Sequence, residues 1–325
     1  MGATSCPAAT VRRPPRPYRP VASLRAGGRI CDHRDMETTR FSFAAADGTT
    51  VEAYRWDGDG DPKAVVQIAH GMGEHAGRYA RLAQALTAAR YVVYANDHRG
   101  HGLTAGSPER QGDLGPGGWS GLVGDMIELG ALARREHPGL PLAVIGHSMG
   151  SFALQQLLLD HSADLDAAVL SGTTAADIVA AGIDTTTEVD LSAFNAPFEP
   201  ARTESDWLSR DPDEVDKYVA DPACGFGLNA AGATGMAEGA AATGDPARLA
   251  GIRPDLPIYV VSGDADPLAG GGQLVQLVGE RYRQAGVHDV TVVLYPGARH
   301  EVFNETNRDE ITSALVTWLD RVTAR

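Results

Sequence analysis

The segment that decides the fold is Gly146-His147-Ser148-Met149-Gly150, in which one serine stands between two glycines. It follows an apolar run at residues 142–145 and precedes a helix-like stretch at residues 151–159. Where a strand turns sharply into a helix there is no room for flanking side chains, so glycines let the two elements approach closely. The pattern predicts a strand-turn-helix unit that holds the Ser148 hydroxyl clear of the backbone, as a nucleophile requires.

Candidate partners for this serine follow later in the chain, each just after a strand-like run. The run at residues 257–261 leads to Asp264 and Asp266, and either carboxylate could orient a histidine. The run at residues 290–295 leads to His300, which is the candidate base. The order Ser, Asp, His along the chain is that of α/β-hydrolases and differs from the orders found on the chymotrypsin and subtilisin folds.

A serine hydrolase also needs an oxyanion hole, which is usually built from two backbone N–H groups. One comes from the residue after the nucleophile, which here is Met149. The other is expected in the loop after an early strand, and residues 64–69 form such an apolar run. We predict that Met72 donates it, because Gly71 and Gly73 on either side allow close backbone approach.

Several segments together resemble the monoacylglycerol lipase and lysophospholipase branch, serine aminopeptidase-like, of the α/β-hydrolases. They are His70-Gly71-Met72-Gly73-Glu74-His75 with Gly77-Arg78-Tyr79, then Asp97-His98-Arg99-Gly100-His101-Gly102, Gly146-His147-Ser148-Met149-Gly150, Gly263-Asp264-Ala265-Asp266 and Ala298-Arg299-His300.

This resemblance implies a serine esterase that acts on medium or long acyl chains and uses no cofactor. It maps the nucleophile onto Ser148, the base onto His300 and the oxyanion donors onto Met72 and Met149. It also favours Asp266 over Asp264 as the acid, because the acid of the family lies three residues after the glycine.

Strand-like and helical runs alternate along the chain after an initial hairpin, in which residues 40–44 and 50–56 flank an Asp47-Gly48 turn. Such alternation predicts a mostly parallel twisted sheet with helices on both faces. We assign this core to residues 36–172 and 254–325 and an inserted helical cap to residues 173–253.

The cap segment, residues 173–253, is expected to cover the substrate pocket. Its second half includes Asn229-Ala230-Ala231-Gly232-Ala233-Thr234-Gly235, whose small side chains indicate a flexible and shallow cover. Asp211 before Pro212 predicts the start of a helix that runs to about Val219. The apolar residues expected to anchor an acyl chain are Phe194, Phe198, Trp207, Phe226, Leu228 and Met236.

Residues 1–35 differ from the rest in composition. They hold seven Arg against two Asp, a net charge of +5, and therefore leave −19 on the remainder of a chain whose net charge is −14. Their many prolines and arginines cannot pack a core, so we expect disorder. Prolines also follow Arg12-Arg13 where an export signal needs an apolar stretch, which favours Met36 as the true initiator.

Composition also limits compartment and partners. No apolar run is long enough to span a membrane, and Cys224 is the only one of three cysteines in the expected folded part, which suits the reducing cytoplasm. The negative body should repel nucleic acid and anionic membranes, so a small neutral acyl ester is the expected partner, with at most transient membrane contact through the cap segment. Nothing in the sequence indicates the oligomeric state.

Two alternative interpretations remain open. His98 and His101 have the spacing of a metal motif, but no thiolate or third ligand accompanies them, so no metal is expected. The same scaffold can also carry a prolyl aminopeptidase or a lactonase, or serve as a non-catalytic ligand-binding module. An aminopeptidase would need carboxylates near the pocket to hold a free amine, and the candidates in the cap segment are Glu188, Glu199 and Glu204.

Overall fold

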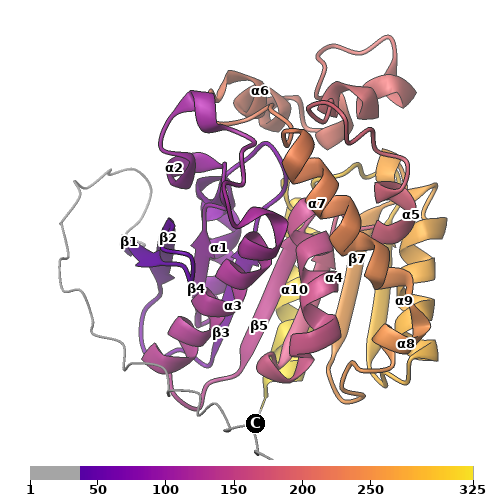
Figure 1. Ribbon diagram of the computed structural model, residues 1–325. Helices are drawn as coiled ribbons and strands as arrows, with labels where there is room; N and C mark the ends of the chain where they lie inside the picture. The colour runs from indigo at the N-terminus through magenta and orange to yellow at the C-terminus, as the bar shows by residue number, and fades with distance from the viewer. Residues whose placement is uncertain (1–36, 325) are drawn as a thin grey trace, which may run out of the picture. The chain divides into compact units, whose positions relative to one another are not determined.

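The computed structural model describes residues 37–324, so the extension predicted at residues 1–35 lies outside the described residues. An eight-stranded sheet in the order β1-β2-β4-β3-β5-β6-β7-β8 forms the centre of the fold (Figure 1). The strands are β1 (Glu37–Ala44), β2 (Thr50–Asp57), β3 (Ala64–Ala69), β4 (Tyr91–Asn96), β5 (Leu142–His147), β6 (Ala167–Ser171), β7 (Ile258–Gly263) and β8 (Val290–Tyr295).

The hairpin predicted at the start of the sheet is present. β1 pairs antiparallel with β2 across a turn in which Gly48 has a φ of +86°, a conformation that favours glycine. β2 pairs antiparallel with β4, and the remaining neighbours are all parallel. The prediction of a mostly parallel sheet is therefore confirmed, and the carboxyl ends of β3 and β5 to β8 meet at one edge.

Helices cover both faces of the sheet because its central strands are apolar on both sides. α3, α4, α7 and α9 contribute to the core on one face, and α1 and α10 pack on the other. The helices and 3₁₀ turns are η1 (Ala76–Tyr79), α1 (Ala80–Ala88), α2 (Gly102–Ala105), η2 (Pro108–Arg110), α3 (Gly118–Glu136), α4 (Met149–His161), η3 (Ser162–Asp164), α5 (Ala176–Ala180), η4 (Leu191–Phe198), η5 (Asp206–Leu208), α6 (Pro212–Ala220), α7 (Ala230–Ala241), η6 (Ala242–Gly244), α8 (Pro246–Leu249), η7 (Pro267–Ala269), α9 (Gln273–Gln284), η8 (Val302–Asn304) and α10 (Arg308–Thr323).

The prediction of a flexible stretch at residues 229–235 is wrong. Asn229 caps α7 by accepting a 2.8 Å hydrogen bond from the Gly232 N–H, and α7 packs against α3 and α4 (Figure 1). A Cβ atom at Gly239 would collide with the Trp119 ring of α3. The small side chains of α7 therefore permit close helix packing on the sheet layer, and they do not indicate a mobile cover.

The earlier part of the cap segment is built from short elements. α6 begins as predicted, with Asp211 accepting a hydrogen bond from the Asp213 N–H and Pro212 in the first turn. Trp207, Leu208 and Tyr218 form a small apolar cluster of their own. These elements supply side chains to the pocket described below.

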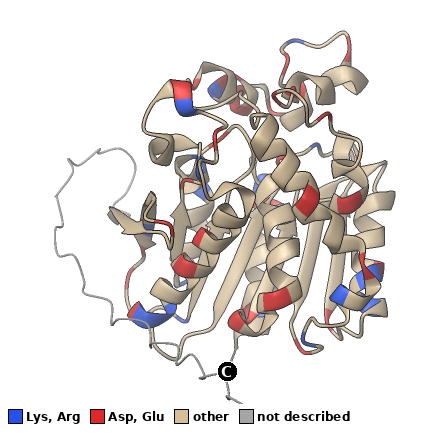
Figure 2. Ribbon diagram, in the orientation of Figure 1, with Lys and Arg blue, Asp and Glu red and all other residues tan. Residues whose placement is uncertain are grey.

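Positions of both charges are distributed along the described chain. Figure 2 shows Lys and Arg positions and Asp and Glu positions on many of the helices and loops of the ribbon. Among residues 37–324, no helix combines the length and apolar character that crossing a lipid bilayer demands.

Candidate active site

Ser148 lies at a strained turn between β5 and α4. Its φ of 51° and ψ of −119° are unusual for a residue with a side chain, and its N–H donates a 3.0 Å hydrogen bond to the Ser171 carbonyl of β6. A Cβ atom at Gly150 would collide with the Ala69 carbonyl of β3, and one at Gly146 would press on the Gly150 carbonyl. The two glycines are thus required by the close approach of backbone around the serine.

His300 and Asp266 form a buried hydrogen-bonded pair. His300 Nδ1 lies 2.9 Å from Asp266 Oδ2, and Asp266 also accepts hydrogen bonds from Ser262 Oγ at 3.0 Å and from the Leu268 N–H at 2.9 Å. These bonds fix the carboxylate and leave Nδ1 of His300 as the donor. His300 Nε2 is buried without a hydrogen-bond partner among residues 37–324, so it is the nitrogen left to accept a proton.

The other candidate acid, Asp264, points elsewhere. It is exposed, and its Oδ1 accepts a 2.6 Å hydrogen bond from the Gly297 N–H. Of the two carboxylates that the sequence offered, the structure therefore brings Asp266 to His300, while Asp264 holds the loop after β8.

The environment of His300 sets its basicity. Burial alone would lower the pKa of the imidazole, but the charge of Asp266 and its hydrogen bond outweigh that effect, and the pKa lies above the ordinary value of 6.5. The imidazole of His300 therefore becomes protonated at a higher pH than a free imidazole as the pH falls.

This shift predicts the acid limb of the pH profile. If His300 is the base, only its neutral form can accept a proton, so kcat/KM should decline as the pH falls through an apparent pKa above 6.5. The measurement is kcat/KM for a short neutral ester from about pH 5 to about pH 9. A rate that stays constant down to about pH 5 would argue against His300 as the base.

Met72 and Met149 border the same site from two loops. Met149 is the first residue of α4, where backbone N–H groups and the helix dipole favour negative charge. The Gly71 N–H, by contrast, is already donated to Glu74 Oε1 at 2.6 Å. Within the loop after β3, this favours the Met72 N–H over that of Gly71 as the second oxyanion donor.

Ser148, His300, Met72 and Met149 all line one mostly apolar pocket. It contains about 560 Å³ of empty space, solvent at its mouth included, of which only about 40 Å³ is wide enough to admit the centres of water molecules. The free space beside Ser148 and His300 is therefore narrow. Its walls include Phe152, Val179, Ile183, Val189, Leu191, Phe194, Trp207, Leu208, Met236 and Leu268.

Three of the six predicted apolar anchors, Phe194, Trp207 and Met236, lie in the pocket wall. The other three lie outside it, so the prediction was half wrong. Phe198 packs under the Arg299 guanidinium, Phe226 packs against the His101 ring, and Leu228 is fully buried in the core.

A charged network at the edge of the pocket was missed by the sequence analysis. Arg78 pairs with Glu74 at 2.6 Å and with Glu301 at 2.6 Å, and the Tyr79 hydroxyl donates to Glu74 at 2.7 Å. Burial raises the pKa of Glu301, but the charge and hydrogen bond of Arg78, together with His147 and Asn304, outweigh it and lower the pKa to about 2. Since Glu74 also holds the Gly71 N–H, the network fixes the shape of the oxyanion loop.

The histidines considered as metal ligands instead connect two loops. His70 Nδ1 donates to the Gly71 carbonyl, and His70 Nε2 accepts from the His98 N–H at 2.9 Å. His101 Nδ1 donates to the Arg99 carbonyl. Burial lowers the pKa of His70, His98 and His101, so all three are neutral at pH 7.

A serine at a strained turn after a central strand, with a histidine–carboxylate pair at the ends of two later strands of a mostly parallel sheet, defines an α/β-hydrolase. Within that class the chain belongs to the family whose model is described as serine aminopeptidase, S33, which matches residues 60–307. The resemblance noted from the sequence motifs is confirmed.

Relatives and solved structures agree with this assignment. A monoacylglycerol lipase of Mycolicibacterium smegmatis is 36% identical over 285 residues, covering 86% of this chain and 95% of the relative. The monoglyceride lipase of Homo sapiens is 28% identical over 298 residues, covering 86% and 89%. The crystal structure of a thermostable carboxyl esterase from Bacillus coagulans in complex with glycerol superposes with a TM-score of 0.79 at 29% identity, covering 89% of this chain and all of the other.

Proposed function

We propose that this protein is a serine esterase that cleaves monoacylglycerol-type esters through an acyl-enzyme. The observation that carries the proposal is the apolar pocket that Ser148 and the Asp266-bound His300 both line, with His300 Nε2 lacking a hydrogen-bond partner among residues 37–324. The names of the similar lipases and of the esterase point to the same ester substrates.

In the proposed mechanism, Ser148 Oγ attacks the ester carbonyl as His300 Nε2 takes the hydroxyl proton. Asp266 holds the imidazole in the required tautomer and stabilises its charged form. The Met72 and Met149 N–H groups stabilise the tetrahedral oxyanion. His300 then protonates the leaving alcohol, and a water molecule repeats the same steps on the acyl-enzyme.

The pocket argues for an ester over a substrate with a free amine. The carboxylates that line it, Glu74 and Glu301, are both paired with the same Arg78 guanidinium. The cap carboxylates Glu188 and Glu204 lie on a neighbouring surface pocket, and Glu199 lies outside both pockets. Among residues 37–324, the pocket therefore offers no unpaired carboxylate to hold the free amine of an aminopeptidase substrate. Turnover of any ester would exclude a non-catalytic binding module.

Acyl-chain length is the test of the substrate class. Each additional CH₂ buried in the pocket should gain up to about 0.8 kcal/mol, so kcat/KM should rise several-fold per two carbons from acetyl esters to medium chains. We expect kcat/KM to stop rising at medium chains because the free space in the pocket is narrow, and not because a mobile cover limits it. Initial rates on p-nitrophenyl esters from acetyl to lauroyl measure this series.

Natural substrates complete the comparison. We expect 1-monoacylglycerols to be cleaved faster than triacylglycerols, because the pocket cannot admit the two additional acyl chains. We also expect them to be cleaved faster than lysophospholipids, because the phosphate of a lysophospholipid would be repelled by an acidic protein. Rates that are highest for acetyl and decline with length would contradict the lipase assignment. Appreciable cleavage of a prolyl amide or a lactone would also contradict the lipase assignment. Either result would still be compatible with a serine hydrolase.

A further inference from the structure

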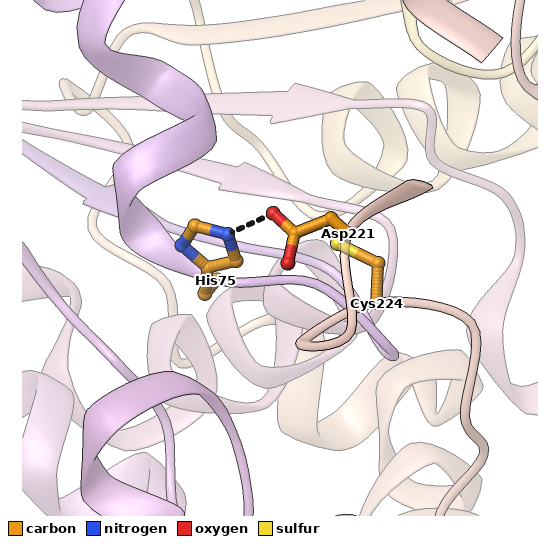
Figure 3. Close-up of side chains that lie close together, drawn as sticks. All are labelled: His75, Asp221 and Cys224. Carbon is orange, nitrogen blue, oxygen red and sulfur yellow. Dashed lines mark hydrogen bonds and ion pairs between the residues drawn. The ribbon is translucent and has the colours of Figure 1, made fainter. Parts of the chain in front are cut away.

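A second cluster of reactive side chains lies outside the pocket, where the oxyanion loop meets the cap segment. His75 follows the oxyanion loop, and Asp221 and Cys224 belong to the turn after α6; Figure 3 shows the three side chains converging. The ligand-capable atoms of all three lie within 4.8 Å of one another, with His75 Nε2 3.0 Å from Asp221 Oδ2. Among residues 37–324 this is the one such group of three.

The backbone around the cluster holds the three residues in place. The Cys224 N–H donates to the Asp221 carbonyl at 3.0 Å, and this turn brings their side chains to the same side. The Gly225 N–H donates to the Gly73 carbonyl at 3.0 Å, which fixes the turn against the oxyanion loop. The His75 ring lies over Gly77, where a Cβ atom would crowd it at 3.0 Å.

The cluster is partly shielded and still reachable from solvent. The side chains of His75 and Asp221 are 21% and 32% exposed, and Cys224 is half-buried. None of the three lines the active-site pocket. A small ion can therefore enter the cluster without passing through the site of the proposed reaction.

We propose that His75, Asp221 and Cys224 form a binding site for Zn²⁺. Imidazole nitrogen, carboxylate oxygen and thiolate sulfur are the ligands that zinc prefers, at about 2.0 to 2.3 Å. In a tetrahedral site those bonds place ligand atoms about 3.3 to 3.8 Å apart. A group already within 4.8 Å reaches that spacing by small side-chain rotations, and water fills the fourth position.

Binding exchanges a hydrogen bond and a proton for coordination bonds. The bond between His75 Nε2 and Asp221 is replaced by one bond from each residue to the ion. The proton that Nε2 donates to Asp221 passes to solvent, and the neutral ring that binds the ion takes its proton on Nδ1 from solvent. Cys224 binds as thiolate, so its proton passes to solvent; burial raises the pKa of this thiol, and zinc displaces the proton as it does at other cysteine sites. The ion, one thiolate and one carboxylate together are neutral.

A zinc ion bound at this cluster would connect two segments of the chain. It would join the turn after α6 to the loop that carries Met72 and Glu74, in addition to the hydrogen bond between Gly225 and Gly73. Since zinc binds the folded arrangement more tightly than the unfolded chain, it should raise the melting temperature, and more so as the free zinc concentration exceeds the dissociation constant.

The test measures binding of Zn²⁺ itself, so it does not depend on the proposed esterase activity. The protein used in the test is the full chain with the substitutions Cys6→Ser and Cys31→Ser, so that Cys224 is its only thiol. Calorimetric titration and competition with a chromophoric chelator should give one zinc ion per chain and a higher melting temperature with zinc. His75→Gln and Cys224→Ser should each weaken binding at least about 10-fold.

Matched controls separate this site from surface histidines. His161 forms a similar 3.0 Å pair with Asp164, so His161→Gln should leave zinc binding unchanged. Cobalt(II) in place of zinc should give a thiolate-to-metal charge-transfer absorption that Cys224→Ser removes. If that variant fails to fold, Asp221→Asn provides the same comparison of affinity. Binding that is absent in the parent chain, or unchanged in the variants that alter the three residues, would overturn the proposal.

Discussion

Ser148→Ala is expected to abolish covalent labelling by a fluorophosphonate and to lower kcat by at least about 10³. The strained turn at Ser148 lies in the pocket that His300 also lines, and alanine leaves this turn without a nucleophile. The measurements are labelling of the purified protein, read by mass, and initial rates on a medium-chain ester. The fold should be retained, because the backbone bonds that hold the turn do not involve the hydroxyl.

The matched control is Ser313→Ala, which removes an exposed hydroxyl on α10 and should label and turn over as the parent does. Labelling that persists in Ser148→Ala would place the nucleophile elsewhere and remove the basis of the proposed mechanism. Loss of labelling with unchanged ester turnover would also contradict it, because the two readouts report the same hydroxyl.

Elements with strong local signals could be predicted from the sequence. β3 and β8 have the predicted bounds, because each is a short apolar run between turn residues. Ser148 and His300 could be predicted to lie in one site because each follows such a run, and the carboxyl ends of neighbouring parallel strands lie at one edge of the sheet.

What could not be predicted depends on contacts between distant residues. The small side chains at the start of α7 suggested flexibility, because the sequence does not show that Trp119 of α3 lies against this helix. The pairing of Arg78 with Glu301 joins residues 223 positions apart, and that of His75 with Asp221 joins residues 146 apart. Neither pair has a local pattern, and both depend on how the cap segment and the loop after β8 are placed.

Asp266→Asn is expected to lower kcat by about 10³ to 10⁴, whereas Asp264→Asn should cost less than about 10-fold. Asp266 accepts the hydrogen bond from His300 Nδ1 at 2.9 Å, and an asparagine there can present its amide N–H to the ring instead. The imidazole would then carry its proton on Nε2, where it cannot take one from Ser148, and its charged form would lose the neighbouring carboxylate. At position 264, asparagine keeps an oxygen for the Gly297 N–H.

Two further readouts separate a catalytic effect from a structural one. The Leu268 N–H can still donate to the side-chain oxygen of an asparagine at position 266, so the melting temperature should change little while the rate collapses. The acid limb of any residual activity should also move to lower pH, because Asp266 is what holds the pKa of His300 above 6.5. If Asp266→Asn retained the parent rate, or if Asp264→Asn lost as much, the carboxylate that orients His300 would have to be assigned anew, and with it the way in which this fold activates Ser148.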